Sequence, residues 1–557
     1  MAKRKSWLAC CFIFAGLLCA VALACLYIVW FVDRGCPSRS FKHAAVSADS
    51  QTCSEIGRNI LKQGGSAVDG AIAALLCTSV VNPQSMGIGG GSIITIKNAT
   101  GEVRVYNFRE TVPKMFKLDL LKDCPTSFSL CKGSHWIGVP GELRGYGLIH
   151  HHYGKLPWAK LFEPTIKLAR DGIPMPDFLI KLLNNPIVKK HVENSSLCEV
   201  FCNNKTTVLG KGDVLRFPKL AETMETIAKE GPDVFYTGKI GQALIQDVKA
   251  AGGTLEAEDL KSFRVNISEA WTVDLGNAKM YIPPPPAGGA ILGFIVGLMK
   301  EYFLTPNSKH GDKKMQMYHH YIEAVKFANG QKRRINDPFY NRNEHADHLI
   351  QSSFIKRISK EISSNHTNEN SYYKRPFTDS IGTTHVSVLD ENGLAVSATS
   401  TINHLFGGGI YSPQTGIILN NELSDFCGRA DTLRAGEQPP SSMTPAILET
   451  DSGGILMIGG SGGSMITSAV ALSIINHLWL GMDLEKAIAA PIVFVDSQNK
   501  VNFELGFDKS VIDGLKALGH QVGQWPYFFN VVNAVEKEND CIVAVSDKRK
   551  QGMSAGY

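Results

Sequence analysis

The sequence predicts a large globular ectodomain that mixes α-helices with β-strands and is tethered by one N-terminal transmembrane helix. With 557 residues, 44% hydrophobic and 20% charged, the chain has the composition of a folded protein with a sizeable core. Residues 7–32 carry no charged side chain, whereas the rest of the chain combines helical periodicity with strand-like alternation. The small net charge of +5, without a basic stripe, gives little support to nucleic-acid binding. The basic run Lys332-Arg333-Arg334 is interpreted as a solvated helix end.

The uncharged segment 7–32 is long enough to cross a bilayer as a helix. Basic residues at positions 3–5 precede it, so the positive-inside rule places residues 1–6 in the cytoplasm and the ectodomain outside. A cleaved signal peptide is the alternative, but its apolar region would span only about 7–15 residues and end at a small-residue cleavage site. We therefore expect a single-pass type II protein of the plasma membrane, with residues 33–42 as a linker.

Beyond the linker, each part of the ectodomain has its own pattern. Residues 54–76 place small and apolar side chains at helical spacing, and residues 93–108 alternate as strands. Residues 140–330 mix helical stretches with turns, and the proline run 283–286 excludes a helix where it stands. Residues 342–381 are polar and rich in turns, which predicts a loosely held segment.

After residue 383 the sequence becomes rich in strands. We expect strands at Thr384–Leu389, Ala395–Thr401, Gly416–Asn420 and Ile455–Gly459, and helices at Ser468–Leu480 and Leu484–Ala490. The glycine run 87–91 resembles a dinucleotide-binding loop, but the third glycine of that fingerprint falls on Ser92 and no convincing strand precedes it. These patterns alone support only an α+β fold.

The chain has 13 cysteines and five N-glycosylation sequons. Four cysteines lie in or beside the predicted membrane segment, namely Cys10, Cys11, Cys19 and Cys25. The others face an oxidising space, where disulfides persist, but their odd number leaves at least one thiol single or paired between chains. Cys198 and Cys202 have a spacing that also fits zinc, although no second Cys or His pair lies nearby. The sequons all precede residue 383, at Asn98, Asn194, Asn204, Asn266 and Asn365.

The run Gly382-Thr383-Thr384-His385-Val386-Ser387-Val388 fits a threonine that becomes a new N-terminus by cutting its own backbone. Such a threonine has a hydroxyl nucleophile and an α-amine whose reference pKa of about 8 suits a general base. By itself this alternating, β-branched run is more typical of an ordinary strand. The interpretation therefore depends on the motifs around it.

Five further motifs support the nucleophile interpretation. They are Asn107–Glu110, Thr399–Asn403, Leu419–Asp425, Pro440–Met443 and Gly459–Ser464. Together with the threonine run, they resemble the γ-glutamyltransferase family of self-cleaving N-terminal nucleophile hydrolases over nearly the whole ectodomain. Residues 136–146 and 419–422 look closest to vertebrate enzymes, including the branch that trims glutathione conjugates such as leukotriene C4.

The resemblance implies an αββα sandwich shared by two cleavage products that form a heterodimer. The large chain would end at residue 382, with an ectodomain part of 43–382, and the small chain would be 383–557. The substrates implied are glutathione and its conjugates, with acceptor amino acids or dipeptides, and neither a metal nor an organic cofactor is required. The family's usual disulfides would pair Cys53 with Cys77 and Cys198 with Cys202.

The amino acid end of a γ-glutamyl group is a zwitterion, so two clusters of opposite charge are needed. The resemblance implies Arg109, Ser441 and Ser442 for the carboxylate, and Glu422, Asp425 and Asn403 for the ammonium. A guanidinium binds a carboxylate bidentately and stays charged at physiological pH. Without the family, Arg109-Glu110 would be interpreted as a surface ion pair, and the two acidic residues as a solvated loop.

The reaction also needs donors for the oxyanion. Gly462 and Gly463 match the family's oxyanion position and offer backbone N–H groups, although a plain turn is the alternative. Thr401 matches the threonine that assists the nucleophile. The expected sequence is attack of the Thr383 hydroxyl on the Gly382 carbonyl, hydrolysis of the ester, and then attack of the freed threonine on a γ-glutamyl amide.

Several other features carry alternatives. We expect His385 to be structural rather than a partner of Thr383, since residues two apart on a strand do not usually come within hydrogen-bond distance. The three consecutive histidines at residues 150–152 alternate sides in any regular element, which makes a metal site there less expected. Phe108 and the pair His404-Leu405 depart from many relatives and are expected to reshape the acceptor side of the pocket. A non-catalytic membrane-anchored paralogue is the rival function. A cell-surface zinc peptidase is a third, but the sequence has no His-Glu-x-x-His motif.

Overall fold

The computed structural model describes Val21 and residues 36–557, apart from residues 38, 126–128, 131, 343–344, 374–378 and 527–530. The predicted transmembrane helix at 7–32 therefore lies outside the described residues, except for Val21, and so do residues 1–6. Among the described residues, no helix has the length and apolar character needed to span a bilayer.

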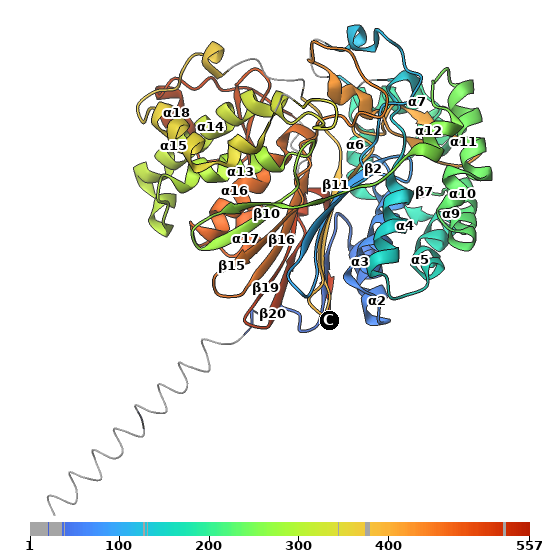
Figure 1. Ribbon diagram of the computed structural model, residues 1–557, viewed down its shortest axis with the longest axis horizontal. Coiled ribbons are helices and arrows are strands. Elements are labelled where there is room, and N and C mark those ends of the chain that lie inside the picture. The colour runs from blue at the N-terminus through green and yellow to red at the C-terminus, as the bar shows by residue number, and fades with distance from the viewer. Residues whose placement is uncertain are drawn as a thin grey trace, which may run out of the picture.

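Two antiparallel sheets form the centre of the molecule (Figure 1). The seven-stranded sheet has the order β21 (Ala555–Gly556), β1 (Ala45–Ser47), β11 (Thr384–Leu389), β12 (Ala395–Thr401), β2 (Gly91–Lys97), β3 (Val103–Asn107) and β8 (Asn266–Glu269). The six-stranded sheet has the order β20 (Cys541–Val545), β19 (Val531–Glu538), β16 (Ile455–Ser461), β15 (Ala446–Thr450), β10 (Ala278–Ile282) and β9 (Trp271–Asp274). Each sheet contains strands from both sides of residue 383.

Helices cover the outer face of each sheet and complete four layers in the order αββα (Figure 1). On the seven-stranded side, α3 (Ala67–Val81) packs on β11 and β12, with α2 (Gln51–Lys62), α4 (Glu142–Tyr153) and α5 (Trp158–Asp171) around it. On the six-stranded side, α16 (Ile466–Leu478) packs on β16 and β19, beside α13 (Gly289–Lys300) and α14 (Gly311–Gln331). This layering agrees with the sandwich that the resemblance implies.

The remaining helices and strands are short or peripheral. The helices are α6 (Asp177–Leu183), α7 (Pro186–Glu193), α8 (Cys198–Phe201), α9 (Pro218–Glu230), α10 (Asp233–Tyr236), α11 (Lys239–Ala250), α12 (Ala257–Ser262), α15 (Ser352–Glu361), α17 (Leu484–Ala489) and α18 (Lys509–Ala517). The strands form four two-stranded ribbons: β4 (Ile173–Pro174) with β7 (Val214–Leu215), β5 (Cys202–Asn203) with β6 (Thr207–Val208), β13 (Ile410–Tyr411) with β14 (Ile418–Leu419), and β17 (Val493–Val495) with β18 (Val501–Phe503).

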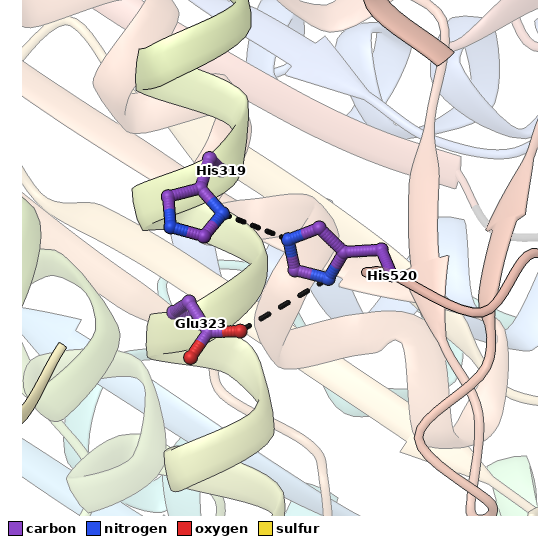
Figure 2. A group of neighbouring side chains, drawn as sticks. All are labelled: His319, Glu323 and His520. Atoms are coloured by element: carbon purple, nitrogen blue, oxygen red, sulfur yellow. Dashed lines mark hydrogen bonds and ion pairs between the residues drawn. The ribbon is translucent and has the colours of Figure 1, made fainter. Parts of the chain in front are cut away.

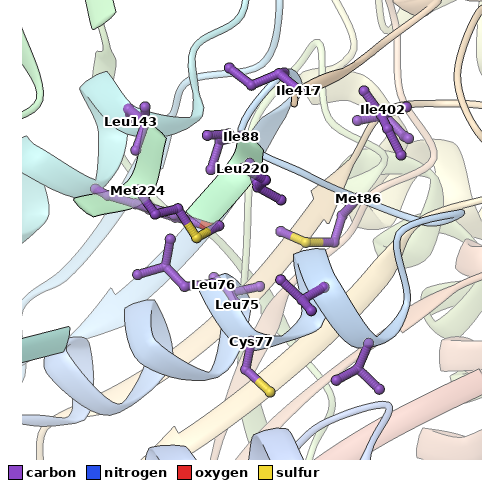
Figure 3. Close-up of a cluster of buried hydrophobic side chains, with 14 of the residues drawn as sticks. Leu75, Leu76, Cys77, Met86, Ile88, Leu143, Leu220, Met224, Ile402 and Ile417 are labelled. Carbon is purple, nitrogen blue, oxygen red and sulfur yellow. The ribbon is translucent and has the colours of Figure 1, made fainter. Parts of the chain in front are cut away.

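The core explains why the two sides of residue 383 fold as one unit. Figure 3 shows Leu75, Leu76 and Cys77 of α3 beside Met224 of α9, with Ile402 and Ile417 from the later part of the chain in the same cluster. Every residue of α3 is buried, because this helix lies between the sheet and its neighbouring helices. A cut at residue 383 would therefore leave both products sharing one hydrophobic core.

Two expected elements differ from the structure. The helix predicted at 54–76 is two helices, α2 and α3, because Gly64 adopts the left-handed φ of +91° and Ser66 starts a new helix with a capping box to Asp69. The strand predicted at Gly416–Asn420 shortens to β14, since Gly416 has a φ of +74° and Asn420 uses its side chain to hold neighbouring loops.

Four disulfides are present among the described residues. They join Cys36 to Cys541, Cys53 to Cys77, Cys124 to Cys427, and Cys198 to Cys202. The second and fourth are the pairs that the resemblance implies. Cys131, the remaining cysteine outside the predicted membrane segment, lies outside the described residues.

The sequon asparagines lie at or near the surface. Asn194, Asn204 and Asn365 are exposed, whereas Asn98 and Asn266 are half-buried. All five are on the part of the chain before residue 383.

Candidate active site

The predicted nucleophile, Thr383, lies immediately before β11 and lines a cavity. It is buried, and its φ of +78° is uncommon for a β-branched residue. The preceding Gly382 cannot be replaced without rearrangement, because a Cβ there would lie 1.7 Å from the carbonyl oxygen of Asn403. The backbone at the predicted cut is therefore held in a conformation that few other residues would allow.

Sheet register brings Thr401 to Thr383. Thr384 of β11 pairs with Ser400 of β12, which places the two threonine hydroxyls 3.2 Å apart. The Thr401 hydroxyl oxygen accepts a hydrogen bond from the Asn403 N–H at 2.8 Å. Because that oxygen accepts from the backbone, its own proton is available to a neighbour such as the Thr383 oxygen.

The glycine turn after β16 lies against the peptide bond between residues 382 and 383. The Gly462 N–H donates to the Gly382 carbonyl oxygen at 2.8 Å, and Gly462 and Gly463 have φ of +113° and +59°. This oxygen would gain negative charge if the Thr383 hydroxyl attacked the Gly382 carbonyl carbon. A Cβ on Gly463 would lie 2.1 Å from the Ser380 carbonyl oxygen, so the close approach requires glycine.

Lys550 is a site residue that the sequence reasoning missed. Its buried ammonium donates to the Thr383 carbonyl oxygen at 2.8 Å, to the Ser461 hydroxyl at 2.8 Å and to an Asp49 carboxylate oxygen at 2.9 Å. The same carboxylate oxygen accepts from the Thr384 hydroxyl at 2.6 Å. Lys550 thus fixes the start of β11, yet in the sequence Lys548-Arg549-Lys550 looks like a solvated charge run.

Arg109, predicted to bind the carboxylate of the substrate, forms ion pairs with the acidic residues predicted to bind its ammonium. Arg109 is 1% exposed, and its two terminal nitrogens lie 2.5 Å from a Glu422 oxygen and 2.6 Å from an Asp425 oxygen. The guanidinium also donates to the carbonyl oxygens of Pro439 and Pro440 at 2.9 and 3.0 Å. A zwitterion bound between these charges would replace the two internal ion pairs, with its carboxylate at the arginine and its ammonium at the acids.

Two buried carboxyl groups, Glu110 and Glu422, and the partly exposed Asp425 lie around this single guanidinium. Burial raises the pKa of Glu422 to about 8 against the opposing effect of Arg109, and burial also raises the pKa of Asp425. Glu110, which the sequence reasoning treated only as an ion-pair partner, has its pKa raised well above the usual range by burial and by Glu422. A bound ammonium would stabilise the charged form of these carboxyl groups, so we expect it to lower their raised pKa values.

The other predicted binding residues line the same cavity, of about 590 Å³. Its wall includes Arg109, Thr383, Thr401, Asn403, Glu422, Asp425, Ser441, Ser442 and Gly463. Asn403 donates to the Ser424 hydroxyl at 2.9 Å, so its amide is oriented by the acidic turn. The structure thus brings the predicted nucleophile and both predicted charge clusters to one cavity.

The interpretation of Lys332-Arg333-Arg334 as a solvated helix end is wrong for Lys332. This side chain is buried in the cavity wall, and burial lowers its pKa to about 7 against the effects of Asp379 and Asp425. Of the two departures from the family, His404 reaches the cavity. Phe108 does not line it; this residue is fully buried and packs edge-to-face on Tyr146 at 6.1 Å between ring centroids. The expectation that Phe108 reshapes the pocket is therefore not supported by its position.

The histidines singled out in the sequence bind protein groups. His385 is buried, and its ring nitrogens lie 2.8 Å from the Thr399 hydroxyl and 3.0 Å from the Ser387 hydroxyl. Burial lowers its pKa to about 3, so the ring is neutral. In the run 150–152, His150 contacts the Leu156 carbonyl oxygen at 2.9 Å and His152 contacts the Tyr106 hydroxyl at 2.9 Å.

A different group, His319, Glu323 and His520, has the composition of a metal site (Figure 2). His319 Nε2 donates to the Ser363 carbonyl oxygen at 2.7 Å, so its Nδ1 accepts from His520 Nε2 at 2.8 Å. His520 Nδ1 in turn accepts from the Lys326 ammonium at 3.0 Å. The acceptor nitrogens of His319 and His520 are both used in hydrogen bonds, and the Lys326 ammonium already supplies a positive charge. We therefore interpret this cluster as a buried hydrogen-bond network and not as a metal site.

Comparisons with known proteins identify the family of the chain. A family pattern described as Gamma-glutamyltranspeptidase matches residues 53–557. The rat protein "Glutathione hydrolase 5 proenzyme" is 46% identical over 565 residues, covering 98% of each chain, and its human counterpart is 46% identical with 94% of each chain covered. Scoloptoxin SSD14 of Scolopendra dehaani is 34% identical, covering 93% of this chain and 92% of its own.

Solved structures extend the agreement to the fold. A cephalosporin acylase from Bacillus halodurans superposes with a TM-score of 0.82 over 94% of this chain and 98% of its own, at 22% identity, which supports the fold alone. Gamma-glutamyltranspeptidase from Helicobacter pylori is 26% identical, with a TM-score of 0.51 over 58% of this chain and 93% of its own. The chain belongs to the gamma-glutamyltranspeptidase family and is an enzyme of this type, a γ-glutamyl hydrolase and transferase.

Proposed function

We propose that this protein cuts itself before Thr383 and then uses the freed threonine to remove the γ-glutamyl group from glutathione and from glutathione S-conjugates such as leukotriene C4. The observation that carries the proposal is the arrangement at the Gly382–Thr383 peptide. Its carbonyl oxygen accepts from the Gly462 N–H at 2.8 Å, and the Thr383 hydroxyl lies 3.2 Å from that of Thr401.

The cutting step follows from these contacts. The Thr383 hydroxyl gives up its proton as its oxygen attacks the Gly382 carbonyl carbon, and the Gly462 N–H stabilises the oxyanion. The peptide nitrogen takes up a proton as its bond to the Gly382 carbonyl carbon breaks, and it becomes the α-amine of Thr383. Water then hydrolyses the resulting ester between Gly382 and the Thr383 oxygen. The products are a large chain that ends in a Gly382 carboxylate and a small chain that begins with Thr383.

The catalytic step repeats this chemistry on a substrate. The freed α-amine takes the proton of the Thr383 hydroxyl, whose oxygen attacks the γ-carbonyl carbon of the donor. The amide nitrogen of the leaving group departs with a proton, and a γ-glutamyl ester remains on Thr383. Water or the amine of an acceptor amino acid or dipeptide then resolves this ester.

The substrate range and the cellular location are parts of the same proposal. A cavity of about 590 Å³ that also includes Ile335, Phe426 and Met443 has room and apolar surface for an S-conjugate beside the charged cluster. Four disulfides suit an oxidising compartment, as does the proposed type II anchor at residues 7–32. Occupied sequons would place every glycan on the large chain.

One experiment tests the catalytic half of the proposal and its substrate range. Rates of hydrolysis of glutathione and leukotriene C4 are measured in parallel on the purified ectodomain and on its Thr383→Ala variant. We expect the wild type to release glutamate from both donors and the variant from neither. A wild type that uses glutathione but not leukotriene C4 would remove the conjugate from the proposal, and one that uses neither would refute it.

A further inference from the structure

Two of the disulfides connect the parts of the chain that the proposed cut would separate. Cys36 is bonded to Cys541 and Cys124 to Cys427, with Cα–Cα distances of 5.5 and 5.6 Å and sequence separations of 505 and 303. In each bond one cysteine precedes residue 383 and the other follows it. The other two disulfides lie wholly before residue 383.

We propose that these two bonds keep the cleavage products covalently joined, and that the Cys124–Cys427 bond also positions the acidic turn that binds the substrate's ammonium. The inference rests on the proposed self-cleavage. It goes beyond a heterodimer held by a shared core, because it assigns Cys124 and Cys427 a part in substrate binding.

The position of Cys427 supports this second role. It directly follows η7 (Glu422–Phe426), its N–H donates to the Ser424 carbonyl oxygen at 3.0 Å, and it lines the cavity itself. The turn carries both acids that pair with Arg109. A bond at the residue that directly follows the turn therefore limits how far these carboxylates move when the Arg109 ion pairs are exchanged for substrate.

The packing beneath the turn shows why such a bond matters. The apolar side chains of η7 lie in a small cluster separate from the two main cores, which contains Val112, Leu120, Trp136, Leu423, Phe426, Cys427 and Leu433, with Cys124 packed against it. Its members come from residues 112–136 on the large-chain side and 423–433 on the small-chain side. Because this cluster buries few side chains, the disulfide is its strongest link across the two chains.

The Cys36–Cys541 bond provides a matched control. It lies at the outer end of β20, beside the pair of hydrogen bonds between Phe41 and Ile542 at 2.7 and 3.0 Å. Neither cysteine lines the cavity. This bond would join the small chain to the linker at residues 33–42, which follows the proposed membrane anchor, and it does not contact the substrate site.

The covalent link is tested on denaturing gels of the full chain. With reductant, the wild type should separate into two bands; without reductant, it should run as one. Double variants that lack a single bond, Cys36→Ser/Cys541→Ser or Cys124→Ser/Cys427→Ser, should still run as one non-reduced band, and the quadruple variant should give two. Two bands from the non-reduced wild type would overturn the inference.

A peptide map separates this inference from the proposed function. Digestion without reductant should yield the linked peptides Cys36–Cys541 and Cys124–Cys427, whether or not the chain has been cut. A map that pairs Cys131 with Cys124 would overturn the crossing Cys124–Cys427 bond, and one that pairs Cys131 with Cys427 would keep the products joined but overturn the role of Cys124. If the reduced wild type is a single chain while both linked peptides are present, self-cleavage has failed and the pairing stands.

The positioning role is tested by kinetics on the two double variants after processing has been verified. Cys124→Ser/Cys427→Ser should raise KM for a γ-glutamyl donor on the order of 10-fold with a smaller change in kcat, because the reactive groups around Thr383 are untouched. Cys36→Ser/Cys541→Ser should leave both constants unchanged. Equal KM values in both variants and the wild type would show that Cys124–Cys427 does not position the turn.

Discussion

The nucleophile side and the substrate side of the cavity are held in different ways. Around Thr383, strands β11, β12 and β16 set positions through backbone register. Gly382 and Gly463 allow close approaches that a side chain would prevent, and Gly462 has a φ of +113°. Around Arg109, a 3₁₀ turn is held by two ion pairs and one disulfide. The first side tolerates almost no change in shape, whereas the second depends on charge and on ties between loops.

The largest effect is expected at the nucleophile. Thr383→Ala has no hydroxyl to start the acyl shift, so the chain should stay uncut and inactive, whereas Thr383→Ser should cut and turn over slowly. A reduced denaturing gel and a γ-glutamyl assay measure both outcomes. A cut and active Thr383→Ala variant would show that this side is not organised around that hydroxyl.

A purely steric change should have nearly the same effect on cutting. Gly382→Ala places a Cβ 1.7 Å from the Asn403 carbonyl oxygen in the present backbone, so the peptide must leave the Gly462 N–H and cutting should be strongly slowed. Pulse-chase labelling of the uncut chain measures this rate. Gly210→Ala is the control, because no atom lies within 4 Å of the Cβ added there and Gly210 is not among the left-handed glycines. Equal rates in the two variants would contradict the steric account of this side.

On the substrate side, the largest change is expected from Arg109→Lys. A lysine keeps the charge but cannot contact Glu422, Asp425 and a substrate carboxylate with one planar fork. Loss of a charged hydrogen bond of about 1.5–3 kcal/mol should lower kcat/KM on the order of 10- to 100-fold, while the chain is still cut. Unchanged kinetics would remove Arg109 from the binding site.

A smaller and more selective effect is expected from Glu422→Gln and Asp425→Asn. These variants should reduce the preference for γ-glutamyl donors over analogues that lack the α-ammonium, because fewer carboxylates would face that group. Matched kcat/KM values for the two donors measure the preference. Full preference in both variants would mean that the ammonium is recognised elsewhere.

The same contrast explains how far the sequence could be interpreted. Strand patterns predicted β12 at its observed bounds, Ala395–Thr401, because alternation and burial act locally. Family motifs indicated both charge clusters, but not that Arg109 pairs with Glu422 and Asp425 across more than 300 residues of chain. Lys550 and the crossing disulfides were missed because long-range contacts leave no local pattern.

The most direct test of the account is N-terminal sequencing of the smaller band from the reduced mature protein. A cut between Gly382 and Thr383 predicts the sequence Thr-Thr-His-Val-Ser, and glycosidase treatment should shift only the larger band, since all five sequons precede residue 383. A single uncut chain with full γ-glutamyl activity would contradict the assignment of Thr383 as an N-terminal nucleophile.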